Sequence, residues 1–207
     1  MPLTLPTIIS LSRLAEPAGP DVFNALARDL LNDEGGSALT NRATDKGGQT
    51  RFGISKRSHP DVDVVNLTRD GALAIYRAKY FDTARVAELP TVLAKMVFDG
   101  AVNHGVPSAG FMLQSAYNQL IQDLDIAGAD PLKADGVTGD KTIAAIAALD
   151  PVQILALTTL FCSQRMIRYG SDATWSANGH GWSRRLWLNT FQSLMQGATA
   201  PAEAASV

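Results

Sequence analysis

Apolar residues recur at helical spacing in the segment that follows Pro20. Five apolar side chains in residues 21–33 fall three or four positions apart and form one stripe: Phe23, Leu26, Ala27, Leu30 and Leu31. Gly35 and Gly36 come next, and glycine suits the left-handed backbone conformation that ends many helices. The pattern predicts an amphipathic helix that ends near Glu34.

Helical spacing returns in several later segments. They are residues 67–81, 90–105, 107–120, 141–149, 152–169 and 182–194. The segment 90–105 is apolar around nearly its whole circumference, which is typical of a buried helix. Residues 38–55 lack a helical period and carry glycine among Thr, Asn and Asp, which predicts turns and short strands. Residues 122–140 hold several glycines and a proline and predict the longest loop. The fold class predicted is mostly α (α+β), with one small β region.

Composition narrows the classes of protein that fit. The chain has 207 residues, of which 46% are hydrophobic and 18% charged, so a packed core is available. The formal net charge is −2, so the chain does not have the excess of basic residues that nucleic-acid-binding proteins usually carry. The single cysteine, Cys162, excludes an intrachain disulfide, and its apolar surroundings predict an inert thiol rather than a catalytic nucleophile. The three histidines lack metal-ligand spacing, so no metal site and no cofactor are predicted.

The sequence predicts neither export by a signal peptide nor an integral membrane segment. The first residues carry no Lys or Arg before the apolar stretch, and Pro6 interrupts it. No stretch approaches the roughly 18 apolar residues that a membrane-spanning helix needs. We therefore expect the protein to be made in the cytoplasm.

Glu34 is the first candidate for chemistry. The carbonyl groups at the end of a helix are partly negative, and both this potential and burial raise the pKa of a carboxyl group. Cleavage of a glycosidic bond requires a carboxylic acid that keeps its proton near neutral pH. Gly35 and Gly36 add no side-chain bulk, so a polymeric substrate has room to approach.

Asp45 and Thr50 complete the candidate catalytic set. Asp45 opens the glycine-rich string 45–50, where an exposed carboxylate stays ionised, and Thr50 has a hydroxyl group able to orient water. Sugar hydrolases use two carboxyl groups in different environments, one as the acid and one as the base or stabiliser. Each residue alone also has an ordinary interpretation: a helix-end carboxylate, a turn aspartate and a strand threonine. Their occurrence in one compact string favours the catalytic interpretation.

The string E-G-G at 34–36, followed by D-K-G-G-x-T-x-x-G-I at 45–54, resembles glycoside hydrolase family 108. These are lysozyme-like muramidases found as phage endolysins and as secretion-associated wall hydrolases. Residues 67–81 and 98–105 and Gln114 agree with the resemblance. The second half resembles the predicted peptidoglycan-binding region that usually follows in this family, through residues 135–142 and 181–185.

The resemblance implies an N-acetylmuramidase with a lysozyme-like fold, in which a small β-hairpin region lies next to the end of the catalytic helix. Glu34 would be the catalytic acid, and Asp45 and Thr50 would hold or activate the attacking water. The gap from Glu34 to Asp45 is longer than in phage lysozymes, and Ser37 replaces the usual aromatic residue after E-G-G. Asn103 and Gln114 are candidates for hydrogen bonds to the substrate.

This interpretation divides the chain into an N-terminal arm (1–20), a catalytic region (21–105), a helical peptidoglycan-binding-like region packed on it (106–195) and a flexible tail (196–207). The expected partner is the peptidoglycan glycan strand, reached in the periplasm after release through a holin or a secretion channel. Two alternatives stay open: a lytic transglycosylase that uses Glu34, and a non-catalytic wall-binding or secretion accessory protein.

Overall fold

The computed structural model describes residues 11–33, 39–40 and 48–199. Its α-helices are α1 (Leu11–Leu14), α2 (Val22–Asp33), α3 (Arg69–Tyr76), α4 (Thr91–His104), α5 (Val106–Asp123), α6 (Asp140–Ala147), α7 (Pro151–Gly170) and α8 (Trp175–Thr199). The π-helical turn η1 (Arg77–Asp82) continues α3, and the 3-10 turn η2 (Val86–Glu88) precedes α4. The strands β1 (Thr50–Arg51) and β2 (Ile54–Ser55) form a two-stranded antiparallel sheet. The predicted fold class, mostly α with a small β region, is confirmed.

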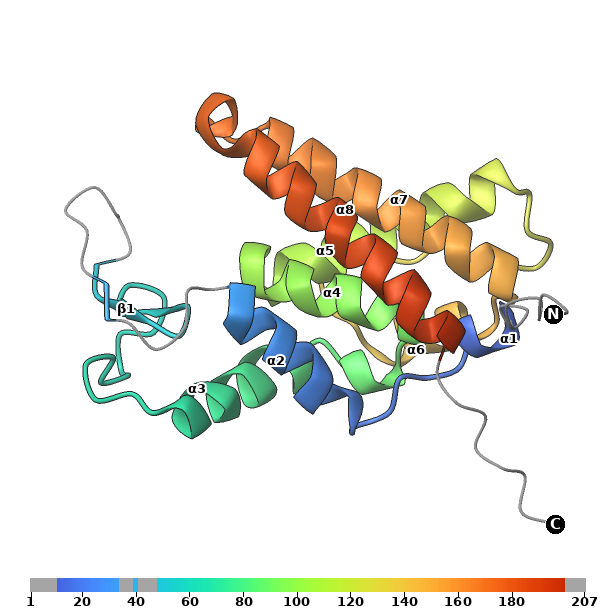
Figure 1. Cartoon of the computed structure of the whole chain (residues 1–207). Helices are drawn as coiled ribbons and strands as arrows, with labels where there is room; N and C mark the ends of the chain where they lie inside the picture. Colours follow the sequence, from blue (N-terminus) through green and yellow to red (C-terminus); the bar gives the residue numbers. More distant parts are fainter. Residues whose placement is uncertain (1–10, 34–38, 41–47, 200–207) are drawn as a thin grey trace, which may run out of the picture.

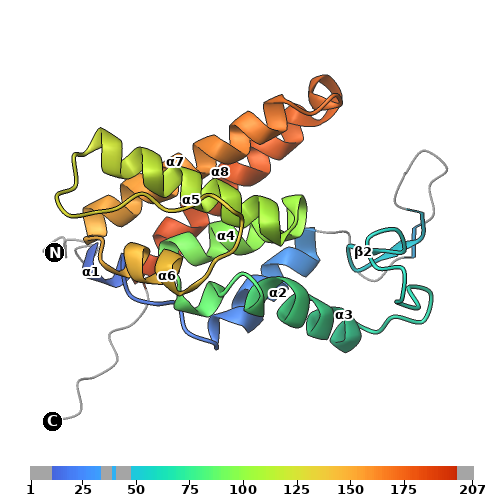
Figure 2. The same cartoon turned by 180° about the vertical axis from the view of Figure 1, so that it is seen from behind.

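Helix α4 is the centre of the molecule. It packs against α5, α7 and α8 on one side and contacts α2 and η1 on the other (Figures 1 and 2). Its residues 92–101 are all buried, as the apolar pattern predicted. An aromatic cluster of Phe23, Phe81 and Phe98, with ring centroids 5.2 to 6.2 Å apart, joins α2, η1 and α4. The regions 21–105 and 106–195 therefore share one core.

The β-hairpin lies at the periphery of the molecule, on the side that the C-terminal end of α2 faces, and Phe52 and Ile54 are buried against the helical part (Figure 1). Phe52 and Gly53 both have positive φ, 52° and 75°, which gives the two-residue turn that matches the twist of paired strands. The hydroxyl group of Tyr76 in α3 donates a 2.8 Å hydrogen bond to the carbonyl oxygen of Phe52. Because this bond is buried, it fixes the turn against the helical part of the chain.

The predicted long loop is confirmed between α5 and α6, and side chains of α5 hold it. The Gln114 amide donates to Val137 O at 2.9 Å and accepts from Gly136 N at 2.8 Å. The Asn118 amide likewise donates to Leu132 O at 2.8 Å and accepts from Leu132 N at 2.7 Å. Two amide side chains on one helix face thus satisfy backbone groups that a loop leaves without partners.

Gly136 is required at its position for two reasons. Its φ is +81°, and a Cβ there would lie only 2.5 Å from the carbonyl oxygen of Pro107. We expect Gly136→Ala to lower the free energy of unfolding by about 2–4 kcal/mol, since strain and overlap add. Gly128→Ala is the matched control, because Gly128 has a similar φ of +75° in open space. Urea denaturation of both variants tests this, and equal losses would show that the contact with Pro107 has no effect.

A buried ionic network joins α4, α7 and α8. Arg165 is fully buried, and its Nη2 lies 2.6 Å from Asp99 Oδ2 and 3.0 Å from the Tyr169 hydroxyl. Arg185 reaches the other oxygen of Asp99, with Nη2 at 2.9 Å. Burial alone would raise the pKa of Asp99, but the two guanidinium groups outweigh it and lower that pKa. One carboxylate therefore neutralises part of the charge of two arginines inside the bundle.

The structure also bears on the predictions about the cysteine and about membrane-spanning segments. Cys162 is buried, as its apolar surroundings predicted, and burial raises the pKa of its thiol, which agrees with the expected inert cysteine. Across the described ranges, no helix combines the length and the apolar character needed to cross a membrane.

Candidate active site

Two of the predicted catalytic residues, Glu34 and Asp45, lie outside the described residues. The elements on either side of them in the chain are described. Helix α2 is described up to Asp33, the residue directly before Glu34. The C-terminal end of α2 lies beside the C-terminal end of α4 in both views (Figures 1 and 2). The chain therefore enters the string 34–54 near the C-terminal end of α4.

Thr50 is the third predicted catalytic residue, and it is the first residue of β1. Its backbone N and O pair with Thr40 through two hydrogen bonds of 2.9 Å, which join residues on both sides of 41–47. Its hydroxyl group lies 3.4 Å from Gly48 O. The half-buried side chain therefore has a position fixed by the strand. Its action on a water molecule stays a prediction.

Asn103 lies in the last turn of α4, close to the end of α2. Its amide nitrogen donates to Asp99 O at 2.7 Å, which orients the exposed side chain. Asn103 and His104 line a hollow of about 360 Å³ between the end of α4 and the α7–α8 pair. The other side chains that line it are Arg168, Tyr169, Asp172, Trp182 and Arg185. Polar and aromatic groups thus meet at the C-terminal end of α4.

One wall of this hollow is aromatic. Trp182 stacks on Tyr169 with ring centroids 5.2 Å apart and an interplanar angle of 26°. Tyr169 is buried, and the His104 ring lies 4.9 Å from it on another side. Trp175 contacts Trp182 at 6.4 Å. Because each ring packs on the next, the Trp182 indole is fixed rather than free to rotate.

His104 has a strongly perturbed environment. Burial, followed by the charges of Arg165 and Arg168, lowers its pKa from 6.5 to about 4. Its Nε2 is buried and has no hydrogen-bond partner within the ranges that the structure describes. The ring is therefore neutral at pH 7, with one nitrogen left available for hydrogen bonding.

This lowered pKa predicts a pH-dependent stability. Because the folded state has the lower pKa, the unfolded state takes up the proton first, and stability falls as the pH drops from about 6.5 toward 4. At most about 1.4 kcal/mol is lost per pH unit. We expect His104→Gln to flatten this part of the profile of melting temperature against pH. His59, whose pKa is also lowered by burial, keeps its own contribution in the variant. An unchanged profile would contradict the neutral buried ring.

Gln114 lies elsewhere. It is buried in the middle of α5 and does not line the hollow. Its side-chain amide forms hydrogen bonds with backbone groups of the loop 124–139. Its Nε2 also lies 3.1 Å from Asp135 Oδ1 and 3.3 Å from Thr142 Oγ1. The structure therefore gives Gln114 a structural role, and the substrate-binding role predicted for it has no support in this geometry.

The network of Asp99, Arg165 and Arg185, of which Arg185 lines the hollow, was not predicted from the sequence. A signal was present, since Asp99 is a carboxylate in an otherwise apolar helix and a buried charge requires a partner. Its partners are 66 and 86 positions away along the chain, so spacing could not identify them. Among the described residues, no cluster of His, Cys, Asp or Glu is arranged to hold a metal ion.

Residues 27–105 match the model of the family described as Glycosyl hydrolase 108. This segment is similar to the domain that defines that family. The protein is therefore a glycoside hydrolase, as the sequence predicted. The matched segment contains most of α2, the string 34–54 and the whole of α4.

Comparison with solved structures extends the similarity to most of the chain. The structure titled "Structure of Brucella abortus SagA" aligns with a TM-score of 0.69 and 25% sequence identity, over 88% of this chain and 98% of that chain. No curated protein matches the chain. With the helices and the two-stranded sheet, this alignment confirms the predicted α+β lysozyme-like fold. The family match ends at residue 105, so it does not extend to the predicted peptidoglycan-binding region 106–195.

Proposed function

We propose that this glycoside hydrolase is an N-acetylmuramidase that hydrolyses the β-1,4 bond between N-acetylmuramic acid and N-acetylglucosamine in peptidoglycan. The observation that carries the proposal is the family match over residues 27–105, which contains the complete string around Glu34. Helix α2 runs up to Asp33, the residue directly before Glu34, so this string follows the amphipathic helix in the chain.

Glu34 acts as the general acid in this proposal. It gives its proton to the glycosidic oxygen as the bond from that oxygen to the anomeric carbon breaks. A water molecule forms the new bond to the anomeric carbon and loses its proton to Asp45, and Thr50 helps to orient this water. Attack on the opposite face inverts the anomeric configuration, which requires carboxyl groups about 6.5–9.5 Å apart, whereas about 5–5.5 Å would give retention.

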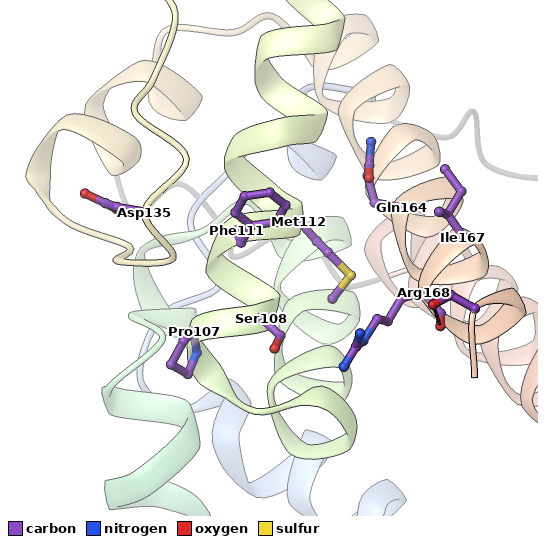
Figure 3. A pocket seen from close by; sticks show the side chains of 9 residues that line it. Pro107, Ser108, Phe111, Met112, Asp135, Gln164, Ile167 and Arg168 are labelled. Atoms are coloured by element: carbon purple, nitrogen blue, oxygen red, sulfur yellow. Dashed lines mark hydrogen bonds between the residues drawn. The ribbon is translucent and has the colours of Figure 1, made fainter. Parts of the chain in front are cut away.

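The region 106–195 contributes to wall binding in this proposal. A second hollow of about 490 Å³ lies between α5 and α7. Phe111 and Met112 of α5 and Ile167 of α7 give it an apolar floor, while Asp135 and Arg168 lie at opposite sides (Figure 3). An apolar floor with one anionic and one cationic side suits a peptide that carries both charges, as the stem peptides of the wall do.

The site of action follows from the substrate. We propose that the enzyme acts on the wall in the periplasm, after release through a holin or export through a secretion channel. Peptidoglycan strands are its partner in this account, and the chemistry proposed for Glu34, Asp45 and Thr50 uses no cofactor.

Hydrolysis of purified sacculi tests the proposed function. We expect the protein to release soluble fragments and new reducing ends, in an amount that grows with time and with enzyme concentration. The test uses sacculi of several peptidoglycan chemotypes, with folding verified by circular dichroism. Binding to every type of sacculus without release of any soluble fragment would overturn the proposal and leave a non-catalytic wall-binding protein.

A further inference from the structure

The hollow between the end of α4 and the α7–α8 pair has the composition of a carbohydrate site. Its volume of about 360 Å³ falls in the range of small-ligand pockets, about 300–1,000 Å³. Asn103, Arg168 and Asp172, whose side chains end in planar polar groups, line the same hollow as Trp182. A sugar ring has an apolar face of C–H groups and hydroxyl groups at its edge, so it needs an aromatic surface with polar groups around it.

The hollow is preorganised by groups that lie behind it. Arg185 is held by Asp99 through hydrogen bonds of 2.9 and 3.2 Å, and Trp182 is held by its stack on Tyr169. Ordering these side chains costs entropy during folding, so little of that cost remains when a ligand binds.

The charges around the hollow favour an anionic sugar over a neutral one. Arg168 and Arg185 contribute two positive charges, and Asp172 contributes one negative charge at the rim. Asp99 lies behind the hollow and is shared by Arg185 and Arg165. Arg168 is exposed, and none of the ion pairs found in the described part of the chain involves it. It also lines the second hollow, so its guanidinium lies between the two.

We propose that this hollow is a saccharide subsite that binds an N-acetylmuramic acid unit of the glycan. Trp182 contacts the apolar face of the sugar ring, and Arg168 binds the lactyl carboxylate or the first carboxyl group of the attached peptide. The assignment rests on the proposed function, because it deepens the account of how the same substrate is held. Arg168 is then a specificity-determining residue, since a guanidinium pairs with a carboxylate through two parallel hydrogen bonds.

Two soluble probes test the subsite by isothermal titration calorimetry with the full chain. Short peptide-free glycan strands carry a lactyl carboxylate on every muramic unit, whereas the N-acetylglucosamine tetramer has the same backbone without that charge. We expect wild type to prefer the glycan strands by about tenfold and Arg168→Gln to abolish this preference. Trp182→Ala should weaken the binding of both probes by about tenfold.

Matched controls lie on α8 outside the hollow. Trp187 and Arg184 are exposed residues of α8 that do not line it, so Trp187→Ala and Arg184→Gln should bind both probes as wild type does. Trp182→Phe keeps an aromatic ring and should retain most of the affinity. It therefore distinguishes loss of the aromatic contact with the sugar from a loss of folding. Wild-type binding of both probes by the folded Arg168→Gln and Trp182→Ala variants would overturn the subsite.

Failure of the subsite and failure of the proposed function give different results. Binding measured with Glu34→Gln does not depend on turnover, so the two probes report on the hollow even when no bond is cut. Normal hydrolysis of sacculi with unchanged binding in both variants would contradict the subsite alone. Probe binding that is sensitive to Arg168 and Trp182, without any release of reducing ends by wild type, would contradict the proposed hydrolysis alone.

Discussion

Glu34→Gln is expected to lower the rate of sacculus hydrolysis by about a hundred- to ten-thousand-fold, the range found when a general acid is lost. Glutamine preserves the size and the hydrogen-bonding shape of the side chain but has no proton to give to the glycosidic oxygen. The loss should appear in kcat, with little change in the affinity for peptide-free glycan strands, because the acid acts mainly in the transition state. Release of reducing ends over time measures it.

The control for this variant is Glu16→Gln, which removes one negative charge from an exposed position after α1 and should hydrolyse sacculi at the wild-type rate. Both variants should show wild-type circular dichroism and melting temperatures. Near-normal hydrolysis by a folded Glu34→Gln protein would contradict the assignment of Glu34 as the acid. A loss of similar size in Glu16→Gln would indicate a general effect of charge instead.

Asp99→Asn is expected to lower the free energy of unfolding by about 3–5 kcal/mol, because it leaves two guanidinium groups without their carboxylate inside the bundle. Arg165 is fully buried and the Asp99 side chain is only 8% exposed, so water cannot replace the lost charge. For a domain of this size the melting temperature should fall by about 10 °C. Chemical denaturation and calorimetry both measure the effect.

Asp140→Asn is the matched control for this loss. Asp140 also pairs with an arginine, Arg85, but its side chain is 96% exposed. Exposed ion pairs contribute about 0–1 kcal/mol, so this variant should be close to wild type. Equal destabilisation by the two substitutions would show that the Asp99 network adds nothing beyond a surface ion pair.

Helical periodicity predicted the helices best where an apolar stripe faces the core. The segment 21–33 became α2 (Val22–Asp33), and 90–105 became α4 (Thr91–His104). The last helix was predicted only over 182–194, whereas α8 begins at Trp175. Glycine weakens a helix, so the glycines before 182 obscured its start. The absence of a side chain at Gly179 is what admits the Trp175 ring, which a Cβ would approach to 2.6 Å.

The inward face of α8 could not be predicted from its pattern. Its buried side carries Asn189, Thr190 and Ser193, while Trp187 and Phe191 are exposed. Ser193 donates to Val92 O at 2.9 Å, and Thr190 lies 3.4 Å from the Cys162 sulfur. Hydrogen bonds to neighbouring helices thus compensate for the burial of small polar groups, and hydropathy does not register them.

Only the part of the candidate site that is contiguous in the sequence could be predicted from it. The string 34–54 is contiguous, so its resemblance to a family was visible, and the family match over 27–105 bears it out. The hollow combines Asn103 at the end of α4 with Arg168 and Trp182 of α7 and α8. Such a site depends on helix packing rather than on spacing, so only the folded chain reveals it.

Mass spectrometry of the soluble products from purified peptidoglycan, with wild type beside Glu34→Gln, tests the central claim most directly. The account predicts fragments that end in reducing N-acetylmuramic acid and that disappear in the variant. Fragments lighter by one water, with anhydro-muramic ends, would contradict hydrolysis and identify a lytic transglycosylase that uses the same acid.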